Sequence, residues 1–429
     1  MMSWTNIYNR NNRTPSGYGT IWAMLLMVLI VLDSADSMAQ TSTEQPAFNR
    51  KTLIKEVRSK VKATQYTDAD ATLKKAFKEH PDLEIDDELN FMEMNVQDKL
   101  IEAENRKIFL NNRPDTAKYF SYIYELYTYG MAISLDSKKY SKQVTQALSR
   151  YRNNLLSAGK FHYKKSQYAE AYKYLDRYLT TNHHPALTRN PEYQADTDTV
   201  ELSKFAVVSA FGNKQYADVS KYMLDALADS VNQQQLLEIG AKSAVELKDT
   251  VSALSYMWQG RMNDPMNDYF CYSLLDYYSD QYDYSVVYEL ATDTYKYLPE
   301  PIDSVKAFRL LYIKGKAEEI LQKEDSALTT FALASAYNPS DPRTYKSIGG
   351  IYLRKAHSLS EQNTALLPRS AEYKKVKAQL DSYYQSAATA FEKVSELQRD
   401  DTSQWLLELR ECYYKLNKGK ELKKLEQYE

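Results

Sequence analysis

Small and large apolar residues recur at a fixed interval through the middle of the chain, in the arrangement of paired helices. Val219, Ala253 and Val287 lie 34 residues apart, each at a position where two helices would pack closely. Pro265 and Pro299 are also 34 residues apart. Proline ends a helix because it cannot donate the backbone hydrogen bond. A period of 34 with this punctuation predicts helix pairs that repeat along the chain.

Repeated helix pairs determine the fold class. Two antiparallel helices cannot bury their apolar faces alone, so each pair must stack on the next one. The sequence therefore predicts an all-α fold, an α-solenoid of stacked antiparallel helix pairs. The chain has only 11 Gly and 12 Pro among 429 residues. This composition favours long helices and few tight turns.

Several stretches carry the residues of one known repeat. Its first helix has a large residue, then Leu and Gly, then Tyr, and its second helix has Tyr, Ala, Phe and Ala before a closing Pro. The matching residues are Tyr66, Ala69, Leu73, Ala76, Pro81, Leu155, Ala158, Gly159, Tyr168, Ala171, Leu175, Leu311, Gly315, Ala327, Phe331, Ala334, Pro339, Tyr345, Ile348, Gly349 and Tyr352. The sequence resembles the tetratricopeptide repeat family, in the form found in bacterial envelopes.

The pattern predicts five regions along the chain. They are a signal peptide (1–39), a linker (40–49), irregular tetratricopeptide-like repeats (50–200), a regular array (201–342), and a last unit with an elongated helical hairpin and capping helices (343–429). In the third region we expect a first helix pair at 51–62 and 68–80, with Asp68 as the N-cap. A second pair or one long broken helix is expected at 86–110.

The N-terminal residues have the pattern of an export signal. Arg10 and Arg13 precede an apolar run from Ile21 to Leu32. This run is shorter than the roughly 20 residues that span a bilayer. Ser37-Met38-Ala39 offers small residues at the positions that signal peptidase reads, so we expect cleavage after Ala39. An uncleaved anchor is the alternative. No Cys follows the run, so we expect no lipid anchor, and we expect a periplasmic protein.

Two segments interrupt the period. Residues 181–199 contain the neighbouring His183 and His184. Adjacent residues rarely supply two ligands to one ion, and no Cys or further His lies near them, so we expect a solvated loop. Residues 357–381 are helix-forming except near Pro368. We expect them to lengthen both helices of one unit into a projecting hairpin.

Charge and cysteine content narrow the possible functions. The net charge is −2 and no basic stripe stands out, so a nucleic-acid partner is not expected. Cys271 and Cys412 lie in first helices several units apart. That separation is too large for a disulfide, so both are expected to be small buried thiols.

The sequence contains no recognisable catalytic constellation. It has no His-Glu-x-x-His, Gly-x-Ser-x-Gly, Cys-x-x-Cys or phosphate loop. His162 takes the place of the usual Tyr of the repeat and is expected to pack rather than to act as a base. Carboxylates such as those of Asp86 and Asp87 lie where helices begin, and negative charge is favourable there. We therefore expect no enzymatic activity, no cofactor and no metal ion.

The resemblance also implies a partner-binding groove, lined by the first helices of the units. Residues at its groove-facing positions are mostly basic or aromatic. They are Lys160, Tyr163, Lys204, Lys242, Tyr269, Tyr272, Arg309, Tyr312, Lys316, Arg343 and Lys346. Such a surface suits an extended peptide that carries carboxylates. The alternative is that Lys and Tyr are simply common in this chain, which has 38 Tyr. The Asn residues of the family's chaperone-tail clamp are missing, so that specificity is not expected.

These observations predict a non-enzymatic, exported scaffold that binds protein or peptide partners in its concave groove, in association with an envelope complex. A different class of function is also open. Tyr269, Tyr272 and Tyr312 could stack on sugar rings, as in a protein that binds glycans or peptidoglycan fragments. A cryptic hydrolase is a further alternative, but no residue supports it.

Overall fold

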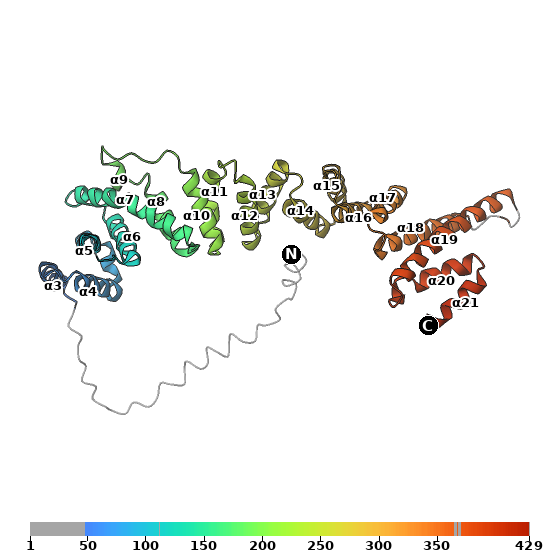
Figure 1. The fold of residues 1–429 in the computed structure, drawn as a ribbon, viewed down its shortest axis with the longest axis horizontal. Helices are drawn as coiled ribbons and strands as arrows, with labels where there is room; N and C mark the ends of the chain where they lie inside the picture. The colour runs from blue at the N-terminus through green and yellow to red at the C-terminus, as the bar shows by residue number, and fades with distance from the viewer. Residues whose placement is uncertain (1–47, 111, 364–366, 368–369, 429) are drawn as a thin grey trace, which may run out of the picture. The chain divides into compact units, whose positions relative to one another are not determined.

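The protein was analysed as a computed structural model that describes residues 48–110, 112–363, 367 and 370–428. The predicted signal peptide and most of the predicted linker lie outside these residues. Every regular element in the described part is a helix, so the prediction of an all-α fold is confirmed (Figure 1). None of the described helices is both long enough and apolar enough to cross a membrane.

The described residues form two compact units that meet between Tyr256 and Met257, inside one helix. We call residues 48–256 the N-terminal unit and residues 257–428 the C-terminal unit. The N-terminal unit begins with α3 (Arg50–Lys62), α4 (Tyr66–Glu79), η1 (Pro81–Ile85), α5 (Asp87–Phe109), α6 (Thr116–Ala132), α7 (Ser141–Lys164) and α8 (Tyr168–Thr181). It continues with α9 (Pro185–Thr188), α10 (Val200–Gly212), α11 (Tyr216–Ala226), α12 (Gln233–Glu246) and the first half of α13 (Thr250–Asn263).

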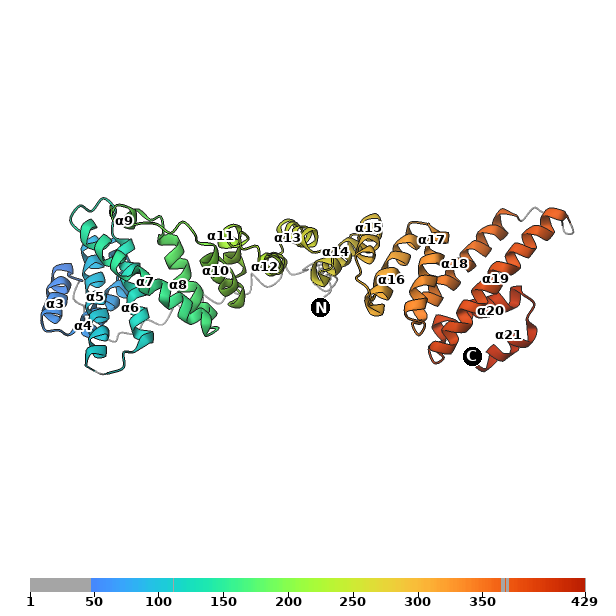
Figure 2. The same ribbon diagram turned by 45° about the horizontal axis from the view of Figure 1, so that its top comes forward.

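The C-terminal unit contains the second half of α13 and the remaining helices. These are α14 (Asp268–Asp280), α15 (Tyr284–Lys296), α16 (Ser304–Ile320), α17 (Glu324–Tyr337), α18 (Pro342–Gln362), α19 (Ala371–Leu397), η2 (Thr402–Gln404), α20 (Leu406–Lys415), α21 (Gly419–Leu425) and η3 (Glu426–Tyr428). α18 and α19 have 21 and 27 residues and are longer than the other helices of this unit. They run alongside each other as a hairpin (Figure 2).

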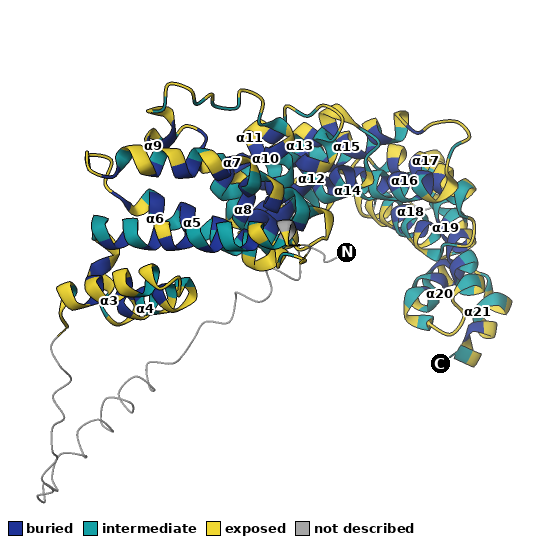
Figure 3. Ribbon diagram, turned by 60° about the vertical axis from the view of Figure 1, so that its left-hand side comes forward, coloured by how far each residue is buried: buried dark blue, intermediate teal, exposed yellow. Residues whose placement is uncertain are grey.

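Within each unit, consecutive helices pack as pairs, and each pair packs on the next. α5 packs on α6 and α7 on α8, while α6 also packs on α7. α16 packs on α17 and α18 on α19, while α17 also packs on α18. Figure 3 shows buried residues in bands where neighbouring helices face each other. This arrangement confirms the predicted α-solenoid of stacked antiparallel helix pairs.

Glycine permits the closest approach inside several pairs. A Cβ atom placed on Gly315 of α16 would lie 2.7 Å from a ring carbon of Phe331 on α17. A Cβ on Gly349 of α18 would lie 2.6 Å from the ring of Phe391 on α19. Both distances are shorter than real carbon contacts, so only glycine allows each ring to lie against the helix backbone. The glycine and the ring that it faces are therefore one packing unit, and both were recognised in the sequence pattern.

The turns inside the helix pairs use left-handed backbone without glycine. Lys214, Lys248 and Tyr282 each have φ of 60° and lie 34 residues apart, one in each turn between a first and a second helix. At Lys248 the next residue, Asp249, donates its N–H to the Ala244 carbonyl at 2.9 Å. This bond closes the end of α12 in the manner of a Schellman motif. The expectation of few tight turns, drawn from the low Gly count, is therefore wrong.

Two expected helix boundaries differ from the structure. Residues 87–109 form one unbroken helix, α5, rather than a pair or a broken helix. α4 begins at Tyr66, so Asp68 lies in its first turn and is not its N-cap. A carboxylate in the first turn still stabilises the helix, because the N-terminal end of the helix dipole is positive.

Residues 182–199 are tied to the N-terminal unit rather than solvated throughout. Arg152 of α7 is only 6% exposed, and its guanidinium donates to Asn182 at 2.8 Å and to Asp196 at 2.9 Å. Tyr178 donates its hydroxyl to the same Asp196 carboxylate at 2.5 Å. The ring of Tyr178 lies 3.9 Å from the guanidinium carbon. A buried cation thus has its counter-charge and its hydrogen-bond acceptors in this segment, which corrects the expectation of a solvated loop.

Candidate functional site

The predicted groove residues all lie on first helices of the pairs, but in both units. In the N-terminal unit, α7 carries Lys160 and Tyr163, α10 carries Lys204 and α12 carries Lys242. In the C-terminal unit, α14 carries Tyr269 and Tyr272, α16 carries Arg309, Tyr312 and Lys316, and α18 carries Arg343 and Lys346. We describe the two groups separately.

The three lysines of the N-terminal group already have carboxylate partners in the chain. Lys160 pairs with Glu201 at 3.2 Å, and Lys204 pairs with Asp229 at 2.6 Å. Lys242 pairs with Glu238, four residues earlier on the same helix. Each of these ammonium groups would have to exchange an internal carboxylate for that of a partner. This group is therefore a weak candidate for binding carboxylates.

The C-terminal group contains a guanidinium that lies on a buried aromatic ring. The guanidinium carbon of Arg309 on α16 is 3.6 Å from the ring centroid of Tyr272 on α14. Tyr272 is only 6% exposed. Desolvation raises the pKa of its hydroxyl to about 12, although the positive charge of Arg309 acts in the opposite direction. The ring is therefore a neutral platform that fixes the position of the cation.

Arg309 differs from the other predicted cations of this unit, because it has no ion pair or hydrogen bond among the described residues. Lys316 pairs with Glu319 at 2.5 Å, and Lys346 donates to Gln404 at 2.6 Å. Arg343 binds Asp341 through two nitrogens, at 2.9 and 2.6 Å. Arg309 thus offers a planar set of donors that the fold itself does not use.

A second ring and guanidinium follow on the next pair of first helices. The guanidinium carbon of Arg343 on α18 is 4.8 Å from the ring centroid of Tyr312 on α16. It is also 5.8 Å from the ring of Phe308. α14, α16 and α18 therefore present two stacked cation–ring pairs, which we call the Arg309 site and the Arg343 site. The structure brings together four of the predicted residues in these two sites.

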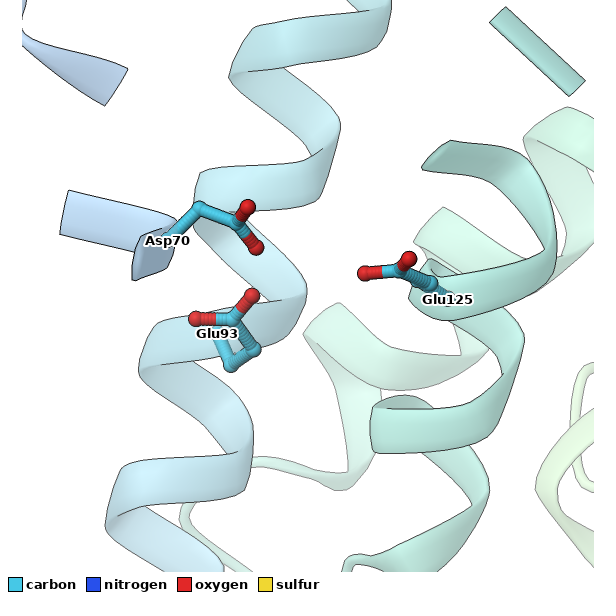
Figure 4. A group of neighbouring side chains, drawn as sticks. All are labelled: Asp70, Glu93 and Glu125. Carbon is cyan, nitrogen blue, oxygen red and sulfur yellow. The ribbon is translucent and has the colours of Figure 1, made fainter. Parts of the chain in front are cut away.

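A cluster of carboxylates in the N-terminal unit was not found by sequence analysis. Asp70 of α4, Glu93 of α5 and Glu125 of α6 point toward one another, with one oxygen of each within 4.8 Å of the others (Figure 4). Gln97 donates to both Asp70 and Glu93 at 2.7 Å. Lys74 pairs with Asp70 at 2.9 Å and also with Glu125. The three acids come from three helices, and no spacing in the sequence connects them.

The chemistry of this cluster favours an internal counter-charge. Three carboxylate oxygens are ligands of the kind that hard divalent cations prefer. The ammonium of Lys74, however, already lies between two of the three acids. The third acid, Glu93, is fully buried, and desolvation, followed by its hydrogen bond to Asp70, raises its pKa well above the ordinary value. One ammonium and one retained proton therefore balance the charge without a metal ion.

No protein family and no curated protein matches the chain. Solved structures do match it. A TPR repeats protein from Bacteroides fragilis shares 13% identity, with 61% of this chain and 98% of that chain covered and a TM-score of 0.26. The C-terminal part of a TPR repeat-containing protein from Cytophaga hutchinsonii shares 10% identity, with coverages of 60% and 92% and a TM-score of 0.32.

The TPR domain of P58(IPK) shares 13% identity, with 86% of this chain and 98% of that chain covered and a TM-score of 0.26. The chain is similar to tetratricopeptide repeat proteins. These TM-scores are too low to support an argument about function. The description of the protein as a tetratricopeptide-like solenoid rests on its own helix pairs and on the glycine–ring contacts within them.

Proposed function

We propose that this protein is a non-enzymatic scaffold whose C-terminal unit binds a carboxylate-bearing segment of a partner protein at the Arg309 site. The observation that carries the proposal is the guanidinium of Arg309, which lies 3.6 Å from the Tyr272 ring and has no acceptor among the described residues. A partner carboxylate would supply the acceptors that the fold leaves out.

The geometry suits bidentate recognition. A guanidinium presents parallel N–H donors in one plane, and these match the two oxygens of a carboxylate. Stacking on the ring restricts the side chain before the partner arrives, so less conformational entropy is lost on binding. Arg in such a position is a typical interface anchor. Asp276 on α14 interacts electrostatically with Arg309 but forms no ion pair with it.

The Arg343 site supports the same proposal in a different way. Its guanidinium is held by Asp341, so it offers less to a partner carboxylate than Arg309 does. Its ring, Tyr312, is half-buried and remains accessible for contact with a partner side chain. A partner that places a carboxylate at Arg309 and an apolar group at Tyr312 would use both sites.

The location of the scaffold is a part of the proposal that rests on sequence alone. The apolar run from Ile21 to Leu32 and the small residues before Gln40 support export and cleavage. Under this proposal the protein works in the periplasm of a bacterial envelope. Its partner would be an envelope protein that this scaffold holds in a complex.

The experiment is a crosslinked pull-down from envelope extract with residues 40–429 as bait. Arg309→Met is compared with Lys296→Met, which removes the same charge from an exposed position on α15. A protein that is captured by the wild type and by Lys296→Met, but lost from Arg309→Met, supports the proposal. If Arg309→Met captures the same proteins as the wild type, the Arg309 site is not the binding site.

Glycan binding is less well supported by this geometry. A sugar ring needs an open aromatic face, and one face of Tyr272 is covered by the Arg309 guanidinium. Tyr269 lies edge-on to Phe270, with ring centroids 5.2 Å apart. A titration with peptidoglycan fragments that gives saturable binding, abolished by Tyr312→Ala, would favour the glycan function instead.

A further inference from the structure

An apolar groove lies between α3 and α5 in the N-terminal unit, far along the sequence from the Arg309 site. Its volume is about 520 Å³. Its deepest residues are Val57, Val96 and Tyr140, which are 0%, 1% and 7% exposed. Phe91 and Met92 of α5 are half-buried beside them, and the Phe91 ring lies 4.4 Å from the Tyr140 ring. The groove is large enough for a bulky side chain of another molecule.

Basic side chains surround this apolar floor. Arg58 and Lys62 come from α3, Lys99 from α5, and Lys139 from the segment before α7. Lys62 has no hydrogen bond or ion pair among the described residues, and Lys139 has only the ring of Tyr140, at 4.8 Å. The rim therefore has an excess of positive charge that the fold does not neutralise.

The one acid of the rim is already engaged. Glu88 accepts from Arg50 at 3.0 Å and from Arg58 at 3.0 Å. Lys99 pairs with Glu102 at 2.9 Å. A second groove, of about 580 Å³, shares Arg58, Lys62 and Glu88 with the first and is also lined by Arg50, Lys51 and Lys55. The cations thus continue along α3, although the sequence as a whole shows no basic stripe.

We propose that the groove between α3 and α5 binds an acidic segment of a partner protein, with one large apolar side chain in the groove and carboxylates beside Lys62 and Lys139. Both halves of this chemistry are on the surface: a recessed apolar floor, and a rim with unneutralised positive charge. The proposal adds a second binding surface to the proposed scaffold. Because this surface lies in the other unit, it can be tested independently of Arg309.

A protein segment fits these observations better than a membrane does. The apolar atoms of Val57, Val96 and Tyr140 are buried, whereas Arg58, Lys62 and Lys139 at the rim are exposed. A lipid surface would meet the cations but could not reach the floor. A single side chain projecting from a peptide reaches both. The rim charges would mainly speed association and make binding sensitive to salt.

The test measures the fluorescence anisotropy of labelled synthetic peptides titrated with residues 40–429. The first peptide has a central Phe flanked on both sides by Glu and Asp. The second replaces Phe by Ala, and the third replaces the acids by Gln and Asn. We expect the first peptide to bind at least tenfold more tightly than either of the others, because each lacks one half of the recognition.

Protein variants locate the binding. Lys62→Ser with Lys139→Ser should weaken binding of the first peptide about tenfold, and Met92→Glu should do the same by placing a charge in the floor. Lys75→Ser with Lys78→Ser removes equal charge from exposed positions on α4 and should leave binding unchanged. Circular dichroism establishes that each variant is folded. Arg309→Met should bind the peptide normally, which separates this proposal from the proposed function.

Three results would overturn the proposal. The first is equal loss in the groove and α4 double variants, which would indicate non-specific attraction by charge. The second is equal binding of the Phe and Ala peptides, which would exclude the apolar groove. The third is no peptide binding together with sedimentation on phosphatidylglycerol vesicles that is lost in Lys62→Ser with Lys139→Ser. That result would assign the basic rim to a membrane.

Discussion

The guanidinium carbon of Arg309 lies 3.6 Å from the centroid of the buried Tyr272 ring, and the guanidinium has no acceptor among the described residues. The ring therefore positions the cation, and the hydroxyl of Tyr272 has no part in this. We expect Tyr272→Phe to keep partner capture, because the ring face remains. Tyr272→Leu should reduce capture, by about tenfold in affinity or on the order of 1.4 kcal/mol. Quantitative pull-down or calorimetry with the captured partner measures both variants, and equal behaviour of the two would contradict the platform role.

Gly349 and Gly350 are neighbours on α18 with opposite predicted responses to alanine. A Cβ at Gly349 would lie 2.6 Å from the Phe391 ring, so Gly349→Ala should destabilise the α18–α19 pair by about 1–3 kcal/mol. At Gly350 the nearest atom is the end of the Arg354 side chain, at 3.7 Å. Gly350→Ala should stabilise the helix by about 0.5–1 kcal/mol through helix propensity.

Amide hydrogen exchange in α18 and α19 measures these two effects locally, which suits a repeat array that does not unfold in one step. Protection should fall in Gly349→Ala and rise in Gly350→Ala. A similar change in both variants would mean that Phe391 does not depend on the missing side chain at Gly349.

Lys248 holds a left-handed conformation, with φ of 60°, that costs a residue with a side chain about 1 kcal/mol. Lys248→Gly should relieve this cost, although glycine also gains freedom in the unfolded chain, so we expect a net stabilisation of less than about 1 kcal/mol. Lys248→Ala keeps the strain and is the matched control. Hydrogen exchange across α12 and α13 reports the change, and a loss of protection in Lys248→Gly would count against the argument.

The carboxyl of Glu93 should make the N-terminal unit less stable as the pH rises. Desolvation first, and then Asp70, raise its native pKa well above the ordinary value of 4.5. The unfolded chain releases this proton near pH 4.5, whereas the native state keeps it. Stability present below pH 4.5 is therefore lost as the pH rises toward the native pKa, at about 1.4 kcal/mol for each unit of pKa shift.

Glu93→Gln should remove this dependence, since the amide keeps a donor for Asp70 and an acceptor for Gln97. We expect the variant to unfold at a higher temperature than the wild type at pH 8 and at the same temperature near pH 4. Thermal unfolding at the two pH values provides the comparison. A variant that is less stable at both values would show that Glu93 is ionised in the native protein.

Cys271 and Cys412 should be unreactive in the native protein. Both are free and buried, as expected from the sequence, and desolvation raises the pKa of both thiols, to about 12 for Cys412. The thiolate is the reactive form, so its population at pH 8 is very small. An aromatic disulfide reagent should label neither thiol before denaturation and both afterwards. Rapid labelling of one thiol in the native protein would contradict its burial.

The sequence by itself determined the repeat and its internal packing. Val219, Ala253 and Val287 are buried at 2%, 0% and 2% exposure, each inside a second helix, as their 34-residue spacing predicts. Gly349 faces Phe391 as the pattern requires. Such contacts join neighbouring helices of one pair, so the spacing along the chain is enough to specify them.

Only the tertiary structure decided which polar groups meet. Asp70, Glu93 and Glu125 come from three different helices, and Arg309 reaches Tyr272 across two helix pairs. The same holds for the groove between α3 and α5. The helical period fixes which face of each helix is buried, but not how neighbouring helices align along their lengths. That alignment comes from side-chain packing, and it determines which charges find partners inside the chain and which remain for another molecule.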